Sequence, residues 1–397
     1  MATVQNSIPR DDVDIFSNEV IAEPWEHYRK LRDLGSVVWL DASKIYALPR
    51  YAEVRAALAD DQRFASSKGI AFNDQMNEVT EGTMLASDGD EHQHLRTIVG
   101  RPLAPRALRR MRAGVEEIGR KLVDRALEEG TFDAIEMLAK PLPLNVVPDL
   151  LGWDDEVRPR LMNWGEASFD AIGPDNELSA AAWPKIIEMV EYAKLVAGER
   201  RCAAGSLSAK VLEAADRGEV SHDQCPALML DYLAPSLDTT ASGLGAAFYL
   251  FSTHPEQWQL LREDPRVIPN AINEVLRWQS PLRAFTRYTT EDVEIDGMTI
   301  PVDSRVAIMY ASANRDERFW DQPEEFDITR ENASRHVAFG YGPHGCAGQG
   351  LTRLETEVVL EELARHVVRF EPAGAPVLGT NNVIYSYSSV PVTVVLA

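Results

Sequence analysis

One segment, from Pro226 to Phe251, constrains the fold most strongly because its hydrophobic residues cover most of a helix circumference. A proline suits the first turn of a helix, so we expect the helix to begin near Pro226. The apolar positions that recur at helical spacing are Leu228, Tyr232, Leu237, Leu244, Phe248 and Phe251. A helix that is apolar on nearly every side has to cross the middle of a large core. We therefore expect a protein built around one long central helix.

Most of the remaining chain has the spacing of amphipathic helices, above all from Tyr51 to about Ala203 and again at Leu351–Val368. Short β-like runs, separated by turns rich in glycine and proline, are predicted at Val37–Leu40, Tyr46–Pro49, Phe285–Thr290, Val293–Ile295, Thr299–Ile300, Val306–Tyr310 and Val383–Leu396. Neither a repeat of fixed period nor a low-complexity linker divides the chain. The sequence predicts a mainly α fold with minor β, formed as a single domain over residues 1–397.

The charge balance limits the kinds of partner that this protein can have. The 397 residues include 62 acidic and 40 basic side chains, which gives a formal net charge of −22. A surface this acidic repels nucleic-acid phosphates and anionic membranes, so no nucleic acid and no membrane is expected as a partner. A chain of this length can still enclose a small molecule in its core.

Cysteine usage and the start of the chain predict a soluble, cytoplasmic protein. Cys202, Cys225 and Cys346 are too few and too widely spaced for a disulfide framework or a zinc site. Residues Met1–Pro9 lack the basic and apolar regions of a signal peptide. No run of about 18 apolar residues predicts a transmembrane helix.

The sharpest local feature is a glycine-dense loop, Phe339–Gly350, that carries Cys346 into the start of a helix. Glycines allow positive φ and let a backbone approach a flat ligand closely. Amides at the start of a helix favour a thiolate over a thiol. Cys346 is therefore a candidate nucleophile or metal ligand, whereas a cysteine without further context fits an ordinary buried position.

Four motifs in order supply that context, and together they resemble the cytochrome P450 family, in particular its soluble bacterial members. The cysteine loop meets every fixed position of the family's F-G-x-G-x-H-x-C-x-G pattern, and Glu274–Arg277 matches E-x-x-R. The segment Ala234–Thr240 resembles the family's oxygen-activation stretch, and Asp88–Arg96 resembles D-P-P-E-H-x-x-x-R. The resemblance covers essentially the whole chain and implies a P450 fold, with a large helical lobe around the long central helix and a small β-rich lobe.

The same resemblance implies a heme cofactor, heme b, and assigns residues to it. Cys346 as thiolate is the expected ligand of the heme iron, where it pushes electron density onto the metal. The residues expected to meet the two heme propionates are His92, Arg96, Arg287 and His344. Glu274 and Arg277 are expected to form a buried structural pair, although an acid and a base at i, i+3 by themselves fit an exposed surface pair equally well.

The resemblance also implies a catalytic acid–alcohol pair, Asp238 and Thr239, in the central helix. Thr239 is expected to hydrogen-bond dioxygen while Asp238 relays protons to it. Here the chain departs from the family pattern, because Pro235-Ser236 stands where a small residue and glycine usually precede the acid. Proline cannot donate to the carbonyl of Asp231, so we predict a kink or a widened turn at this point.

Family topology, finally, gives a set of candidate substrate contacts. These are Ile70, Phe72, Leu85, Ala86, Phe169, Ile172, Ala234, Phe285 and Ile384, and as a group they favour a compact apolar or aromatic substrate. Lys68 and Arg283 are two possible partners for a substrate carboxylate, as in the aromatic-acid-oxidising members that the chain resembles around Ser168–Leu178. Each of these residues alone fits an ordinary core or surface position.

A basic cluster between Arg96 and Lys121 predicts where electrons enter. It contains Arg96, Arg101, Arg106, Arg109, Arg110, Arg112, Arg120 and Lys121 against only Glu116 and Glu117. On so acidic a protein, a local positive patch favours docking of an acidic electron carrier. The expected carrier is a ferredoxin or flavodoxin with its reductase.

The sequence therefore predicts a heme-thiolate monooxygenase that inserts one oxygen atom from O2 into a small, hydrophobic, aromatic substrate, with electrons from NAD(P)H. Hydroxylation and oxidative O-demethylation fit equally well. Two alternatives stay open: a peroxide-driven peroxygenase, which the Asp238-Thr239 pair disfavours, and a non-catalytic protein that binds heme or a small molecule.

Overall fold

The computed structural model describes residues 7–396. Most of the segment Met1–Pro9, for which the sequence predicted no signal peptide, therefore lies outside the described part of the chain. The first eight helices are α1 (Asn18–Ala22), α2 (Trp25–Leu34), α3 (Tyr51–Ala59), α4 (Asp74–Val79), α5 (Gly89–Gly100), α6 (Pro105–Glu129), α7 (Pro141–Leu151) and α8 (Arg158–Ile172). The others are α9 (Glu177–Glu199), α10 (Leu207–Asp216), α11 (Cys225–Leu233), α12 (Asp238–Thr253), α13 (Pro255–Glu263), α14 (Ile268–Gln279), α15 (Tyr310–Ala313) and α16 (Gln349–His366). Within the described residues no helix is both long and apolar enough to cross a membrane.

The strands form one larger sheet and three small ones. The six-stranded sheet has the order β1-β2-β3-β9-β6-β4 and comprises β1 (Arg10–Asp11), β2 (Val38–Leu40), β3 (Ile45–Leu48), β9 (Arg305–Ile308), β6 (Phe285–Thr289) and β4 (Phe64–Ala65). The small sheets are β10 (Val367–Pro372) with β13 (Pro391–Leu396) and β5 (Thr131–Asp133), β7 (Val293–Ile295) with β8 (Met298–Ile300), and β11 (Val377–Leu378) with β12 (Tyr387–Ser389). The predicted short strands are thus confirmed, with boundaries shifted by a few residues.

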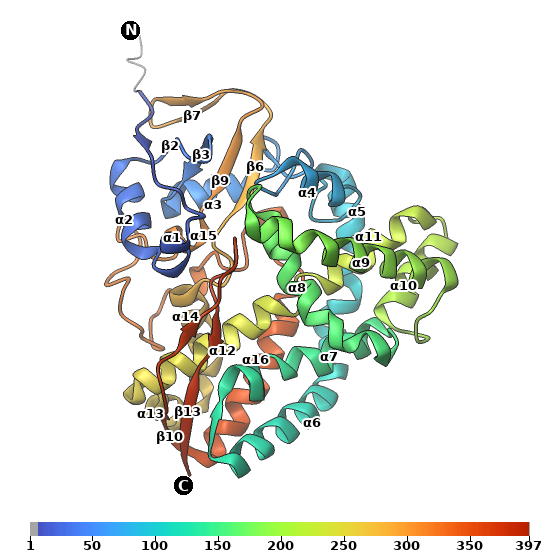
Figure 1. Cartoon of the computed structure of the whole chain (residues 1–397), viewed down its shortest axis with the longest axis vertical. Coiled ribbons are helices and arrows are strands. Elements are labelled where there is room, and N and C mark those ends of the chain that lie inside the picture. Colours follow the sequence, from blue (N-terminus) through green and yellow to red (C-terminus); the bar gives the residue numbers. More distant parts are fainter. Residues whose placement is uncertain (1–6, 397) are drawn as a thin grey trace.

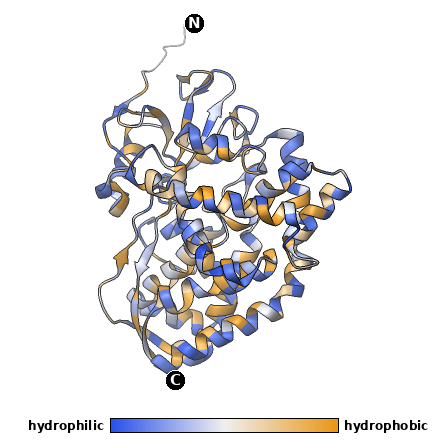
Figure 2. Cartoon of the chain, turned by 45° about the vertical axis from the view of Figure 1, so that its right-hand side comes forward, coloured by the Kyte–Doolittle hydropathy of each residue, from blue (hydrophilic) through white to orange (hydrophobic). Residues whose placement is uncertain are grey.

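The molecule divides into a helical lobe and a smaller lobe around the six-stranded sheet (Figure 1). The sheet lobe has a hydrophobic cluster of its own, in which Leu48, Val306 and Trp320 are almost fully buried. Of the two larger clusters, one lies in the helical lobe around α12 and α14, and the other extends from helices α8, α9 and α11 to β2 and β3 of the sheet. Hydrophobic and hydrophilic residues alternate along the outer helices (Figure 2), which explains why their amphipathic spacing was readable from the sequence.

The central helix is two helices, because Pro235 interrupts it. Helix α11 ends at Leu233 and α12 begins at Asp238. The amide of Ala234 still donates to Leu230 at 3.0 Å, but the next α-helical bond runs from Ala241 to Leu237, also at 3.0 Å. Between them the Ser236 amide closes a tighter turn by donating to Leu233 at 3.2 Å. The predicted kink or widened turn is confirmed, and it divides the long central helix that was expected from Pro226 to Phe251.

Candidate active site

The cysteine loop precedes α16 and is shaped by two glycines with positive φ. Gly340 and Gly342 have φ values of 68° and 71°, which L side chains rarely adopt. A Cβ on Gly342 would lie 2.4 Å from the carbonyl oxygen of Leu58, so this position has room for glycine alone. The amide of Cys346 donates to the carbonyl of Phe339 at 2.7 Å and closes the loop. The Cys346 side chain is thereby fixed at the wall of a large cavity.

Two opposing effects act on the Cys346 thiol. Burial raises its pKa, while amide groups of Gly348 and Gln349 and the charge of Arg96 lower it. Burial is the larger effect and opposes the stabilisation expected from the start of the helix. A metal cation bound to Cys346 would stabilise the thiolate, because a coordinating thiol is deprotonated outright.

Four side chains with nitrogen donors line the same cavity as Cys346: His92, Arg96, Arg287 and His344. The rings of His92 and His344 have centroids 4.0 Å apart, and a guanidinium nitrogen of Arg96 bonds the carbonyl of Gly345. His92 Nε2 is buried and has no hydrogen-bond partner among the described residues. The structure therefore brings together all four residues that the sequence predicted to share a site.

Asp88 accompanies this donor group. His344 Nε2 lies 3.3 Å from Asp88 Oδ1, and the amides of Ser66 and Ser67 donate to the same carboxyl group. Although burial raises the pKa of Asp88, the bonds from His344 and these amides hold it well below its usual range. Burial is also the largest effect on His92 and lowers its pKa to about 4.

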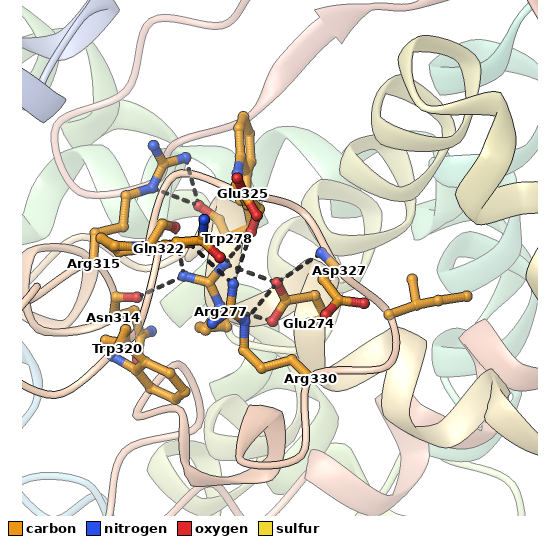
Figure 3. A network of polar contacts seen from close by, with 12 residues as sticks. Glu274, Arg277, Trp278, Asn314, Arg315, Trp320, Gln322, Glu325, Asp327 and Arg330 are labelled. Carbon is orange, nitrogen blue, oxygen red and sulfur yellow. Dashed lines mark hydrogen bonds and ion pairs between the residues drawn. The ribbon is translucent and has the colours of Figure 1, made fainter.

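The predicted Glu274–Arg277 pair is buried and belongs to a larger network (Figure 3). Both side chains are fully buried, and Arg277 donates to the two carboxylate oxygens of Glu274 at 2.7 and 2.8 Å. Arg277 also donates to the carbonyls of Asn314, Pro323 and Glu325, while Arg330 donates to Glu274 at 3.1 Å. The network ties α14 to the segment that leads to the cysteine loop, which is a structural role. The alternative of an exposed surface pair is excluded.

Asp238 and Thr239 face two different cavities. Thr239 lines the large cavity with Cys346, and its hydroxyl donates to the carbonyl of Pro235 at 2.7 Å. Asp238 lines a second cavity, whose wall is more polar, together with Lys140, Glu166 and Asp170. Burial is the main cause that raises the pKa of Asp238 to about 7, with Glu166 and Asp170 adding to it and Lys140 opposing it. The first residues of α12 therefore connect an ionisable cavity to an apolar one.

Of the predicted substrate contacts, about half line the large cavity: Leu85, Phe169, Ile172, Ala234 and Phe285. Ile70, Phe72, Ala86 and Ile384 are not part of its wall. Phe72 packs edge-on against Phe16 with centroids 4.8 Å apart, and Ile384 forms a β-bridge with Leu282. Sequence spacing identified the right segments but not which side chains of each segment turn inward.

The two predicted carboxylate partners lie outside the cavity, so that part of the sequence interpretation is corrected. Lys68 is an exposed surface side chain that forms an ion pair with Asp303. Arg283 is buried but donates to the main-chain carbonyls of Ile15, Asn381 and Asn382. The ammonium group of Lys68 and the guanidinium group of Arg283 thus have partners outside the large cavity, and neither residue lines it.

Sequence reasoning missed the ionisable groups around the central helix. Glu166 and Asp170 lie one turn apart on α8, Lys140 immediately precedes α7, and no spacing links them to Asp238. Asp231 also lines the large cavity. The sequence does contain a signal for it, because Asp231 is an acid in an otherwise apolar helix, two turns before Asp238. An acid among apolar residues costs free energy when it is buried, so its presence points to a function.

Comparison with known proteins identifies the family. A model of the cytochrome P450 family matches residues 185–373. The chain is 36% identical over 389 residues to cytochrome P450 CYP199A2 of Rhodopseudomonas palustris, covering 97% of this chain and 94% of that protein. It is 32% identical over 348 residues to 6-deoxyerythronolide B hydroxylase of Saccharopolyspora erythraea, and this match covers 84% of this chain and 83% of that protein. The chain belongs to the cytochrome P450 family and is a monooxygenase of that family.

Solved structures agree on the fold. The cytochrome P450 CYP109Q5 from Chondromyces apiculatus superposes with a TM-score of 0.82 at 28% identity, covering 97% of this chain and 99% of that one. Cytochrome P450 CREJ, solved in complex with (4-ethylphenyl) dihydrogen phosphate, superposes with a TM-score of 0.87 at 25% identity, covering 94% and 98%. The P450 fold that the resemblance implied is confirmed.

Family membership implies a heme-thiolate cofactor, and the residues present fit one. Cys346 and the four nitrogen-bearing side chains face one cavity, so Cys346 would hold the heme iron and the other four would meet the two propionates. The unpartnered Nε2 of buried His92 is a free donor for a carboxylate oxygen. Arg96 and Arg287 add two cations to the same wall.

Proposed function

We propose that this protein is a heme b monooxygenase that inserts one oxygen atom from O2 into a small, hydrophobic, aromatic substrate by hydroxylation or oxidative O-demethylation. The whole chain would act as one domain, with Cys346 as the iron ligand and the propionates held by His92, Arg96, Arg287 and His344. The observation that carries the proposal is the placement of Thr239 in the cavity of Cys346 and of Asp238 in the polar cavity behind it. That arrangement supports a proton route from the polar cavity to the cavity of Cys346.

The heme, when bound, supplies the activation of dioxygen with electrons delivered one at a time. The protein's own part is positioning and proton transfer. Asp238 takes a proton at its carboxyl group from the polar cavity, where Lys140, Glu166 and Asp170 lie. A pKa of about 7 suits a group that must both accept and release a proton near neutral pH. The Thr239 hydroxyl, anchored by the Pro235 carbonyl, presents its oxygen to the large cavity.

The walls of the large cavity support an apolar, aromatic substrate. Phe169, Ile172, Leu85 and Phe285 line it, and aromatic rings pack well against such side chains. The structural relative CREJ was solved with a small aromatic compound, a phosphate ester of 4-ethylphenol, at comparable fold similarity. A compact aromatic molecule is therefore the substrate class that the lining favours.

Three measurements on the purified holoenzyme separate this proposal from its alternatives. A carbon monoxide difference band near 450 nm is expected if Cys346 is a thiolate ligand, and Cys346→Ser should abolish it. Product formation with NADH and a ferredoxin system should exceed product formation with hydrogen peroxide. The reverse order would support a peroxygenase. A 450 nm band without turnover under either condition would support a heme-binding protein.

We also propose that the N-terminal half of α6 is the docking face for an acidic electron carrier, a ferredoxin or flavodoxin. Arg106, Arg109 and Arg110 are exposed and form no ion pair within residues 7–396. Leu108 lies so close to the start of α16 that a Cβ on Gly350 would be 2.6 Å from it, so this face adjoins the cysteine loop. By contrast, Arg112, Arg120 and Lys121 pair with acidic neighbours and contribute less free charge.

Charge reversal at Arg109 and Arg110 tests the docking face. The double Arg→Glu variant should slow reduction of the heme by a ferredoxin about tenfold or more at low salt, with a smaller effect at high salt. Reversal of Arg120 and Lys121 changes the net charge equally, roughly 16 Å further along the helix, and should have little effect. Equal rates in the two double variants would refute the proposal.

A further inference from the structure

Asp231 is a half-buried acid that neither the proton route nor the heme site uses. It lies in α11, two turns before Asp238, and its accessible surface opens into the large cavity. Its Oδ2 accepts a hydrogen bond from the amide of Met84 at 2.7 Å, and the amide of Leu85 interacts with the same carboxyl group. The acid therefore joins the central helix to the loop that covers the cavity.

No cation compensates this carboxyl group. Among residues 7–396 Asp231 forms no ion pair, whereas Asp238 has Lys140 in its cavity. Burial raises the pKa of Asp231 to about 7 against the two amide bonds. Two amides alone do not repay the burial of a carboxyl group, so its presence in an apolar wall calls for a further partner.

The surroundings of Asp231 define what that partner can be. Met84 and Leu85, whose amides meet its carboxyl group, and the preceding Leu230 have apolar side chains on the same cavity wall. The cations of the wall, Arg96 and Arg287, belong to the group beside the cysteine loop, and neither Lys68 nor Arg283 reaches the cavity. A carboxylate placed here would meet another acid and no cation, which is unfavourable.

We propose that Asp231 is the polar anchor of the substrate cavity and selects an apolar molecule that carries a hydroxyl donor over one that carries a carboxylate. The carboxyl group accepts the hydroxyl hydrogen, and the aromatic body of the molecule extends along the central helix towards Thr239. Asp231 and Thr239 line the same cavity from the two sides of the helix break at Pro235. This inference rests on the proposed function, because it assigns the substrate class of the same site.

Three probes of nearly equal size test the proposal in the purified holoenzyme: 4-ethylbenzyl alcohol, 4-ethylbenzoate and 4-ethylbenzyl methyl ether. Dissociation constants come from the spin-state change of the heme and, independently of it, from calorimetry. The alcohol should bind at least tenfold more tightly than the benzoate, because the benzoate faces Asp231 without a cation. It should also bind more tightly than the ether, which lacks a donor.

The variant Asp231→Asn sharpens the test. Its amide oxygen can still accept from the Met84 amide, while its NH2 group turns a donor towards the cavity. The alcohol-to-benzoate preference should therefore shrink at least tenfold or reverse. Glu355→Gln is the matched control, because Glu355 is also buried and lines the same cavity from α16. That control should keep the preference of the unaltered protein. Thermal unfolding and the 450 nm band report whether each variant is folded and loaded.

Several outcomes would overturn the inference. They are tighter binding of the benzoate, binding of none of the probes, or an alcohol preference that Asp231→Asn leaves unchanged in a folded, heme-loaded protein. Failure of the proposed function would be recognised by different observations, namely the absence of the 450 nm band or the absence of NADH-driven turnover of any compound that binds. If the protein oxidises aromatic substrates but its binding preference does not depend on Asp231, only the proposed role of Asp231 is refuted.

Discussion

Two regions of this protein bury charged side chains, and they do so in opposite ways. In the network of Figure 3, the fully buried Glu274 receives bonds from two arginines, and Arg277 shares its remaining donors among three main-chain carbonyls. Along the broken central helix, Asp231 and Asp238 form no ion pair within the described residues. Both acids there border a cavity instead of packed protein.

The difference separates structural from functional burial of charge. A buried ion whose every donor and acceptor is matched has no capacity left for a ligand, so it holds elements together. A buried acid without a cation has a pKa near neutrality and free hydrogen-bonding capacity, which are the properties of proton carriers and ligand anchors. Compensation of charge, rather than burial itself, distinguishes the two roles in this protein.

The largest expected effect follows from removing one partner of the matched network. Glu274→Ala leaves Arg277 buried without its carboxylate, which should cost about 3–5 kcal/mol in the free energy of unfolding. Urea denaturation followed by circular dichroism measures this loss, and heme content should fall with it. Because that variant can fail to fold, Glu274→Gln provides a milder test of the same direction.

Arg160→Ala is the surface counterpart. Arg160 and Glu188 are each 46% exposed, and an exposed pair is worth about 1 kcal/mol or less. If the two substitutions destabilised the protein equally, the network of Figure 3 would have no special structural role.

The next effect concerns stability as a function of pH. The folded state raises the pKa of Asp238 from 3.8 to about 7, so between these values the folded protein binds more protons than the unfolded chain. Unfolding free energy should therefore fall as pH rises from about 4 to 7, by at most about 4 kcal/mol from this group. Asp170, whose pKa burial raises to about 6, contributes in the same direction, and Lys140 opposes both acids.

Asp238→Asn should flatten this dependence, because the amide does not titrate. Denaturant titrations of the holoenzyme at several pH values measure the slope for both proteins. An identical slope in the variant would mean that Asp238 is ionised in the folded state throughout this range.

The third prediction is a loss of turnover in the same variant. Removing a proton carrier typically costs about 100-fold in rate, so Asp238→Asn should lower NADH-driven product formation by about that factor. The dissociation constant of the substrate should stay within about twofold, because Asp238 faces the polar cavity and not the substrate cavity. Glu166→Gln, in the same polar cavity, should cost less than about tenfold. If Glu166→Gln lowered the rate of product formation more than Asp238→Asn, Glu166 and not Asp238 would be the main proton carrier.

The smallest effect is expected at the helix break. Pro235→Ala restores a main-chain amide that can donate to the main-chain carbonyl of Asp231, so α11 and α12 should join into one helix. The free energy of unfolding should change by about 1 kcal/mol or less. The Pro235 carbonyl, which now accepts from the Thr239 hydroxyl at 2.7 Å, would then enter the helical ladder. Hydrogen peroxide released per NADH consumed should rise a few-fold. Unchanged coupling would show that the break itself does not position Thr239.

Local patterns in the sequence predicted much of this site. The i, i+3 spacing of Glu274 and Arg277 and the glycines before Cys346 survive in the structure because they depend on backbone geometry within a few residues. The break at Pro235 is equally local, since it follows from a missing amide hydrogen. These features are fixed by covalent structure and need no knowledge of the rest of the fold.

Side-chain direction was where sequence reasoning failed. Lys68 and Arg283 stood in the expected segments, yet one pairs with Asp303 at the surface and the other binds main-chain carbonyls. Asp231, which faces the cavity, went unassigned. Which side of a loop or helix turns inward depends on its packing against distant segments, and no single stretch of sequence records that packing.

The sequence by itself determined the family, the cysteine loop, the ion pair and the interrupted central helix, because each is written in residues that are neighbours along the chain. Only the tertiary structure decided which charges are matched and which are not. It brought His92 to His344 and Lys140 to the cavity of Asp238, and it left Asp231 without a cation. Those pairings join residues separated by tens to hundreds of positions, so the electrostatics of the site exist only once the chain has folded.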